Sequence, residues 1–191
     1  MTEKMNIILG SNSPRRNELL AQLGFEFTKV SITCDEYFSP DMAVGEVAEY
    51  LANKKSMAYP RLQDSDILIT ADTVVISEGI ILNKPADRAE AIHMLSTLSG
   101  KEHSVQTGVC IRSVAKQESF TSKTAVKLRK ISQEDIDHYV DTYKPYDKAG
   151  AYGIQEWFGL ALVECISGSF YNVVGLPTDQ LHKRLKDDYF V

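Results

Sequence analysis

Two adjacent arginines occur in a segment whose residue types suit phosphate binding. In "ILGSNSPRRNELLAQLGF", residues 8–25, Arg15 and Arg16 fall in the first turn of an expected helix. Ser13 is the expected N-cap of that helix and Pro14 takes its first position. The macrodipole favours acids there, so two cations point to an anionic ligand that binds the free N–H groups. A solvated arginine pair on a capped helix is the competing interpretation.

Carboxylates stand at two places where strands are expected. Asp72 interrupts the apolar run "ILITADTVVI", and Asp35 and Glu36 follow another expected strand in "TCDEY". Burial of an unpaired carboxylate is costly, so Asp72 belongs either to an exposed strand end or to a site that needs it. Together these carboxylates would suit a magnesium ion, which prefers oxygen ligands and phosphate partners. A solvated turn is the alternative for the pair in "TCDEY".

A glycine-rich segment near the end of the chain combines a cation with an amide. "YDKAGAYGIQ", residues 146–155, contains Lys148 and Gln155 together with two glycines. Glycine lets the backbone approach a ligand closely, which favours a binding loop. Plain turn residues would give the same composition.

The elements that must position these residues alternate between strands and helices. This pattern predicts an α/β protein, built on an elongated mixed β-sheet flanked by helices. Residues 66–76 predict a strand broken near Asp72, and "LALVECI", residues 160–166, predicts another strand. Residues 103–114 and 119–131 alternate as an antiparallel pair around a short turn.

Composition excludes several classes of protein. The chain has 191 residues, 43% of them hydrophobic and 25% charged, which is typical of one large globular domain or two small lobes sharing a core. A net charge of -5 argues against a general nucleic-acid or membrane-surface binder. No segment approaches the about 18 apolar residues of a membrane helix, and the start of the chain does not resemble a signal peptide.

Cysteines and histidines show no pattern of a metal site. Three isolated cysteines suggest reduced thiols and a cytoplasmic location rather than a disulfide framework or zinc site: Cys34, Cys110 and Cys165. Four histidines lack metal-ligand spacing and are expected at the surface or on helices: His93, His103, His138 and His182.

The motifs together resemble those of the Maf family. "SNSPRRNELLAQLG", "ADTVV", "NKP", "DKAGAYGIQ" and "GSFYNVVGLP" occur in the family's order, from residue 8 to about residue 181. The resemblance implies an α/β architecture like that of inosine triphosphate pyrophosphatases, in a single domain over residues 1–191 with two lobes around a central cleft. It also implies a homodimer, and hydrolysis of a nucleoside triphosphate to the monophosphate and pyrophosphate with Mg2+ or Mn2+.

The resemblance also implies roles for particular residues. Asp72 matches the catalytic proton acceptor, and Glu36 with Asp72 matches the metal-site carboxylates. Arg15, Thr73 and Gln155 match positions that mark the branch resembling dTTP/UTP pyrophosphatases. The substrate-binding positions as a whole are Ser11, Arg15, Arg16, Lys55, Thr73, Lys84, Lys148 and Gln155.

Several alternatives stay open at the level of sequence. Asp72 would either deprotonate a water directly or ligate a metal that lowers the pKa of that water. A nucleotide-binding regulator of cell division or septum formation with little turnover would share the phosphate-binding features. Hydrolysis of modified pyrimidine or other altered nucleotides would share the chemistry and differ in the base pocket.

Overall fold

The computed structural model describes residues 5–189, which form two compact units. The described residues of unit 1 are 5–72, 107–122 and 175–189, and unit 2 comprises Thr73–Gln106 and Lys123–Val174. The prediction of one domain with two lobes around a cleft stays a prediction, and its first four and last two residues lie outside the described part of the chain.

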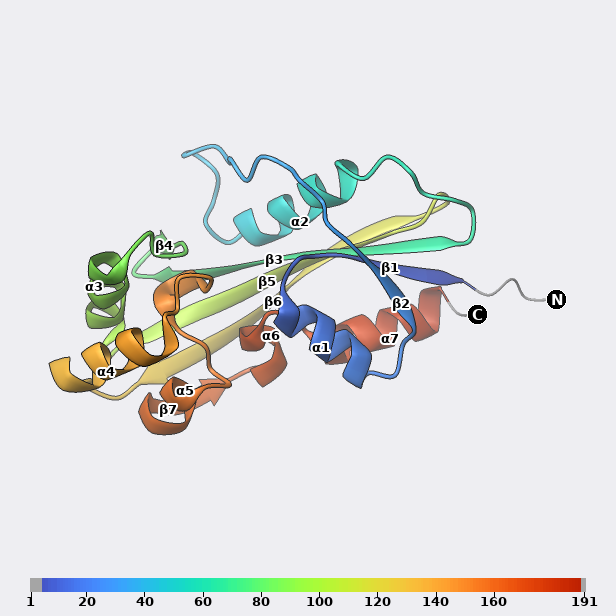
Figure 1. The fold of residues 1–191 in the computed structure, drawn as a ribbon. Coiled ribbons are helices and arrows are strands. Elements are labelled where there is room, and N and C mark those ends of the chain that lie inside the picture. Colours follow the sequence, from blue (N-terminus) through green and yellow to red (C-terminus); the bar gives the residue numbers. More distant parts are fainter. Residues whose placement is uncertain (1–4, 190–191) are drawn as a thin grey trace. The chain divides into compact units, whose positions relative to one another are not determined.

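Within the described residues, seven strands form one mixed β-sheet with the order β2-β1-β3-β5-β6-β7, and β4 pairs with β3 (Figure 1). Strand β1 pairs parallel with both β2 and β3, whereas the β3–β4 and β6–β7 pairs are antiparallel. A mixed sheet flanked by helices is therefore confirmed. The strands are β1 (Asn6–Gly10), β2 (Phe27–Val30), β3 (Asp66–Ser77), β4 (Ile80–Leu82), β5 (Glu102–Arg112), β6 (Gln117–Leu128) and β7 (Val163–Ser167).

The helices of the described residues occupy the connections between strands and the end of the chain. Ser13 caps the first helix as predicted, because its hydroxyl accepts a hydrogen bond from the Arg16 N–H at 3.4 Å. The helices are α1 (Pro14–Gln22), α2 (Val47–Met57), α3 (Arg88–Leu98), α4 (Gln133–Tyr143), the 3-10 helix η1 (Ala149–Ala151), α5 (Trp157–Leu162), α6 (Phe170–Val174) and α7 (Thr178–Asp188).

In unit 1, helix α2 covers one face of the sheet and helices α1 and α7 cover the other (Figure 1). Thr70 of β3 donates to the carbonyl of Ala52 in α2 at 2.7 Å, which ties this helix to the sheet. On the opposite face, the Arg184 guanidinium lies 4.0 Å from the centre of the Phe120 ring. The paired residues 7–9 of β1 and 67–69 of β3 are buried, as a parallel strand pair requires.

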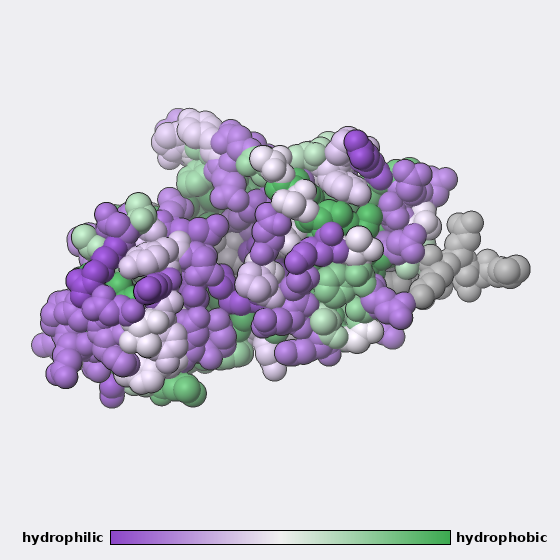
Figure 2. Space-filling model, in the orientation of Figure 1, coloured by the Kyte–Doolittle hydropathy of each residue, from purple (hydrophilic) through white to green (hydrophobic). Residues whose placement is uncertain are grey.

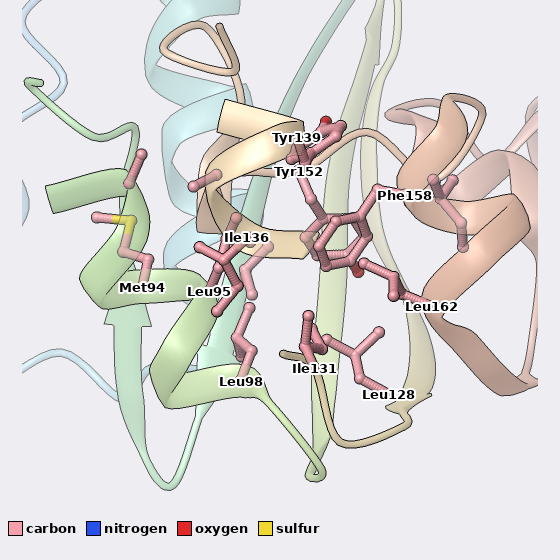
Figure 3. Close-up of a cluster of buried hydrophobic side chains, with 14 of the residues drawn as sticks. Met94, Leu95, Leu98, Leu128, Ile131, Ile136, Tyr139, Tyr152, Phe158 and Leu162 are labelled. Carbon is pink, nitrogen blue, oxygen red and sulfur yellow. The ribbon is translucent and has the colours of Figure 1, made fainter. Parts of the chain in front are cut away.

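Unit 2 has its own hydrophobic core, drawn in Figure 3. Tyr139 of α4, Tyr152 and Phe158 of α5 meet there, with ring centres 5.0 Å apart for Tyr139–Phe158 and 4.8 Å for Tyr152–Phe158. Tyr139 and Phe158 are fully buried. These aromatic contacts hold α4, α5 and the segment before α5 to one another.

Two predictions about strands are wrong. Strand β3 runs unbroken from Asp66 to Ser77, because Asp72 has a charged partner and needs no strand end to reach water. In "LALVECI", the first residues belong to α5 and the strand β7 starts at Val163. Phe158 and Leu162 are buried four residues apart while Leu160 is 88% exposed, which is the spacing of a helix face.

His103 also contradicts its prediction, since it lies buried in β5 rather than at the surface or on a helix. Its Nε2 is 2.7 Å from the hydroxyl of Tyr152, and burial lowers the pKa of the imidazole to about 4. The pair is a neutral, buried contact inside unit 2.

The outside of the molecule is mostly polar on the face shown in Figure 2, where hydrophobic residues form separate patches. Among the helices of residues 5–189, none combines the length and apolar character that crossing a bilayer requires. The three cysteines predicted as reduced are all free thiols.

Candidate active site

The start of α1 gathers the residues of the predicted phosphate signature in unit 1. Ser11 is buried after β1, and its hydroxyl accepts a hydrogen bond from the Ser13 N–H at 3.2 Å. The Arg16 guanidinium donates through Nε to the carbonyl of Gly175 at 2.8 Å and approaches the Ser11 hydroxyl with Nη1 at 3.5 Å. Arg15 is half-buried one residue earlier.

No acid stands in the first turn of α1, so the positive end of the helix and two guanidinium groups share one place. Burial lowers the pKa of Arg16, and the Asp72 carboxylate opposes that effect. The combination of cations and helix N–H groups suits a phosphate.

A lysine joins the two predicted metal-site carboxylates. The ammonium of Lys55, in α2, lies 2.5 Å from Oδ1 of Asp72 in β3 and 2.8 Å from Oε1 of Glu36 in the loop after β2. The side chains of Lys55 and Asp72 are only 14% and 13% exposed, whereas that of Glu36 is 53% exposed. Three residues from distant parts of the sequence thus form one charged cluster.

The electrostatics of this cluster keep the lysine charged. Burial lowers the pKa of Lys55, but the charge of Asp72 and hydrogen bonds to Asp72 and Glu36 outweigh it, so that its pKa is raised. The ammonium of the preceding lysine, Lys54, instead lies 3.2 Å from Oδ2 of the exposed Asp35. Asp35 therefore pairs with Lys54 apart from the Lys55 cluster.

A metal would have few protein ligands here. Within residues 5–189, no group of three or more His, Cys, Asp or Glu side chains is placed to hold a metal ion. Glu36 and Asp72 are two hard oxygen donors that already share one cation, Lys55. Two carboxylates with water and phosphate completing the shell are the usual surroundings of Mg2+, so this donor set fits that ion.

The other predicted site residues belong to unit 2. Thr73 is half-buried in β3, and Lys84 is exposed just after β4. The antiparallel register pairs Val75 with Leu82, so the chain leaving β4 runs toward the level of Thr73. The N–H of Gly150 donates to the carbonyl of Asn83 at 3.2 Å, which joins this segment to the 146–155 loop.

Lys148 is buried in that loop and carries two carboxylate partners. Its ammonium is 2.7 Å from Oδ1 of Asp147 and 3.2 Å from Oε1 of Glu156. Gln155 is exposed, directly before Glu156. Gly150 has a φ of +69°, and a Cβ there would meet the Val75 side chain at 3.0 Å, so this position requires glycine.

Sequence reasoning missed two residues that contact or adjoin this loop, Tyr139 of α4 and Glu156. Tyr139 donates to Oε2 of Glu156 at 2.5 Å, and its oxygen accepts from the N–H of Gly153 at 2.9 Å. The sequence around Tyr139 carries no local sign of a contact with a residue 17 positions away. Glu156 offered one signal, since it directly follows the predicted Gln155.

The cluster in unit 1 has the parts needed for hydrolysis of a phosphoanhydride. An ionised carboxylate can accept a proton from a water, and nearby cations can stabilise charge on phosphate oxygens. In unit 2, the exposed amide of Gln155 offers donors and an acceptor to a ligand.

Comparison with known proteins agrees with these features. A protein of Bacteroides thetaiotaomicron named dTTP/UTP pyrophosphatase is 47% identical over 186 residues, covering 96% of each chain. A Porphyromonas gingivalis protein of the same name is 48% identical, covering 97% of this chain and 95% of its own. The solved structure of a HAM1 protein from Coxiella burnetii has a TM-score of 0.51 with 16% identity, covering 96% of this chain and 99% of that one, and shows the same fold.

The family model described as "Maf-like protein" matches residues 6–188, almost the whole chain. The match contains the α1 phosphate segment, the Lys55 cluster and the 146–155 loop described above. The chain belongs to the Maf family.

Proposed function

We propose that this protein is a nucleoside triphosphate pyrophosphatase that hydrolyses dTTP and UTP to the monophosphate and pyrophosphate. The observation that carries the proposal is identity of 47–48% with relatives named dTTP/UTP pyrophosphatase over nearly the whole chain. The charged cluster of unit 1 supports the reaction type, because it combines a carboxylate base with cations beside a helix start.

In this proposal Asp72 accepts the proton of the water that attacks the α-phosphorus, and pyrophosphate leaves. Lys55 holds the Asp72 carboxylate in place through the 2.5 Å contact. Arg15, Arg16 and Ser11 bind phosphate oxygens at the start of α1, where the backbone N–H groups and guanidinium groups favour negative charge. Developing charge in the transition state is stabilised by the same cations.

The proposal includes a divalent metal, Mg2+ or Mn2+, held by Glu36 and Asp72. When bound, such an ion supplies positive charge to the phosphates and lowers the pKa of a coordinated water. The support is the chemistry of the donors, two carboxylates within 2.8 Å of one shared cation. Activity that survives exhaustive chelation would remove the metal from the proposal.

The proposal keeps the substrate-binding roles that the family resemblance implies for four residues of unit 2. Gln155 reads the edge of the pyrimidine ring, since its exposed amide can both donate and accept. Thr73, Lys84 and Lys148 are further substrate-binding residues in this proposal. The ammonium of Lys148 also pairs with the carboxylates of Asp147 and Glu156.

A pyrophosphate-release screen tests the function. Purified protein is incubated with dTTP, UTP, CTP, GTP and modified pyrimidine triphosphates, with Mg2+ or Mn2+, and with chelator as the control. We expect pyrophosphate and monophosphate from dTTP and UTP at the highest kcat/KM. Release of orthophosphate as the first product would contradict attack at the α-phosphorus, and tight nucleotide binding without turnover would favour a regulatory role.

A homodimer is also proposed. Large apolar side chains are exposed on the helices before and after β7, the last strand in the sheet order: Leu160, Phe170 and Tyr171. Light scattering on the purified protein measures the mass, and 21.4 kDa would indicate a monomer.

A cytoplasmic location is proposed from the cysteines. All three are free thiols, which persist in a reducing compartment. Fractionation of the cells with an antibody to the protein would test this location.

A further inference from the structure

Glu156 uses both oxygens of its carboxylate to join separate parts of unit 2. Oε2 accepts from the hydroxyl of Tyr139 at 2.5 Å, and Oε1 lies 3.2 Å from the ammonium of Lys148. The side chain is 21% exposed. A carboxylate with a neutral donor on one oxygen and a cation on the other has little freedom to turn, because rotation would break both contacts.

Tyr139 is the fixed end of this arrangement. It is fully buried, stacks on Tyr143 with ring centres 5.0 Å apart, and packs against Phe158. The close-up in Figure 3 shows its ring among the other aromatic side chains of the core. Its hydroxyl also accepts from the Gly153 N–H at 2.9 Å, so one buried group holds both ends of the turn that contains Gln155.

Gly153 leaves room for the side chains of Gln155 and Glu156. A Cβ at this position would lie 2.8 Å from Cδ of Glu156 and 3.1 Å from Nε2 of Gln155. Both side chains therefore fold back over the glycine. The amide of Gln155 and the carboxylate of Glu156 share one small space, so a shift of Glu156 changes the surroundings of Gln155 directly.

Lys148 connects the same carboxylate to the beginning of the loop. Its side chain is only 9% exposed, and its ammonium is shared between Glu156 and Asp147. Glu156 thus links Lys148 and Gln155, two residues with proposed substrate contacts that lie seven positions apart in the sequence.

We propose that Glu156 is a positioning residue for base selectivity, held between Tyr139 and Lys148 so that the Gln155 amide keeps one orientation toward the pyrimidine ring. This inference rests on the proposed function, because it names what sets the substrate preference of that same site. Glu156 itself does not contact the substrate. Its effect passes through Gln155, and a site that hydrogen-bonds a substrate group discriminates strongly only when its donor and acceptor are held in place.

The central test is Glu156→Gln, which keeps the size of the side chain and removes its charge. We measure kcat/KM for dTTP, UTP, CTP and GTP and form the ratio of the first two to the last two. We expect this ratio to fall by about 10- to 100-fold, mainly through a higher KM for dTTP and UTP. Tyr139→Phe keeps the buried ring and removes the hydroxyl that donates to Glu156, so it should also lower this ratio.

Tyr152→Phe is the matched control. It removes the phenolic hydroxyl of another tyrosine in the core of unit 2, and this hydroxyl lies 2.7 Å from Nε2 of His103. The ratio should stay within about twofold of the unsubstituted protein, the size of an ordinary distant effect. Far-UV circular dichroism and the emission of the single tryptophan, Trp157, establish that each variant is folded.

A double-mutant cycle separates positioning from general damage. In a Gln155→Ala background, Glu156→Gln should change the ratio by no more than about twofold, because the group that it orients is gone. Full additivity of the two changes would contradict the inference. If Glu156→Gln does not fold, Tyr139→Phe takes its place in the cycle.

The outcomes also distinguish this inference from the proposed function. If the unsubstituted protein releases pyrophosphate from none of the triphosphates, the proposed function fails. If it prefers dTTP and UTP and the folded Glu156→Gln and Tyr139→Phe variants keep that preference, the inference about Glu156 fails and the proposed function stands.

Discussion

Lys55 and Asp72 form a short ion pair, with Nζ and Oδ1 2.5 Å apart and both side chains nearly buried. The lysine comes from α2 and the aspartate from the middle of β3, so the pair joins a helix to the strand that it covers. Burial alone would lower the pKa of Lys55, yet the charge of Asp72 and the contact with Glu36 raise it. The lysine therefore remains an ammonium at neutral pH.

Asp72→Asn keeps the shape of the side chain and removes the proposed proton acceptor. We expect kcat for dTTP to fall by at least about 100-fold, the usual cost of losing an acid–base group. Asp64→Asn, an exposed aspartate in the loop before β3, is the matched control and should leave kcat unchanged. Near-normal turnover in folded Asp72→Asn protein would exclude Asp72 as the base.

Lys55→Met should destabilise unit 1 because it leaves the Asp72 carboxylate buried without its cation. The expected loss in the free energy of unfolding is about 3 kcal/mol, the typical cost of removing one partner of a buried pair. Lys54→Met is the control, because Lys54 pairs with the largely exposed Asp35 and such pairs contribute less than about 1 kcal/mol. Urea denaturation measures both variants.

The ion pair also predicts the behaviour of a double variant. Lys55→Met with Asp72→Asn should be more stable than Lys55→Met alone, since the uncompensated charge is then absent. Equal or greater destabilisation of the double variant would mean that the methionine harms packing rather than electrostatics.

His103 should make the fold sensitive to mild acid. Its pKa is lowered from 6.5 to about 4 by burial, so the folded protein binds a proton less readily than the unfolded chain. The stability that this group contributes is complete above pH 6.5 and is lost as pH falls toward 4, by about 3 kcal/mol in total. His103→Gln, which stays neutral, should flatten that part of the curve of unfolding free energy against pH.

Gly153→Ala should disturb the loop without adding or removing a charge. The new Cβ would lie 2.8 Å from Cδ of Glu156, so the carboxylate has to move away from Tyr139 or the backbone has to shift. We expect a drop in selectivity for dTTP and UTP similar to that of Glu156→Gln. The double variant Gly153→Ala/Glu156→Gln should be little less selective than either single variant. A further drop in selectivity of the same size would show that Gly153→Ala does not act through Glu156.

The parts of the fold set by neighbouring residues could be predicted from the sequence. Ser13 caps α1 because the cap needs only an N–H three residues ahead, and a proline follows it. The mixed sheet follows from alternating strands and helices. The pairing of Asp72 with Lys55 is different, since the two residues lie 17 positions apart in different elements, and only the family resemblance brought both into one site.

Contacts between distant side chains explain what was missed. The unbroken course of β3 depends on Lys55, and the burial of His103 depends on Tyr152, so neither leaves a local pattern. The interaction of Glu156 with Tyr139 is of the same kind. The start of β7 was predicted too early in the sequence, because the apolar run "LALV" fits both a short strand and the end of a helix.

The contact between Arg16 and the carbonyl of Gly175 has a consequence for how the protein is made. Unit 1 draws on three separate stretches of sequence, and the last of them starts at Gly175. A ribosome makes the arginine early and the glycine 159 residues later. The start of α1 therefore cannot reach its final arrangement during most of translation. If this end of the helix binds phosphate as proposed, the nascent chain should acquire nucleotide binding only near the completion of synthesis.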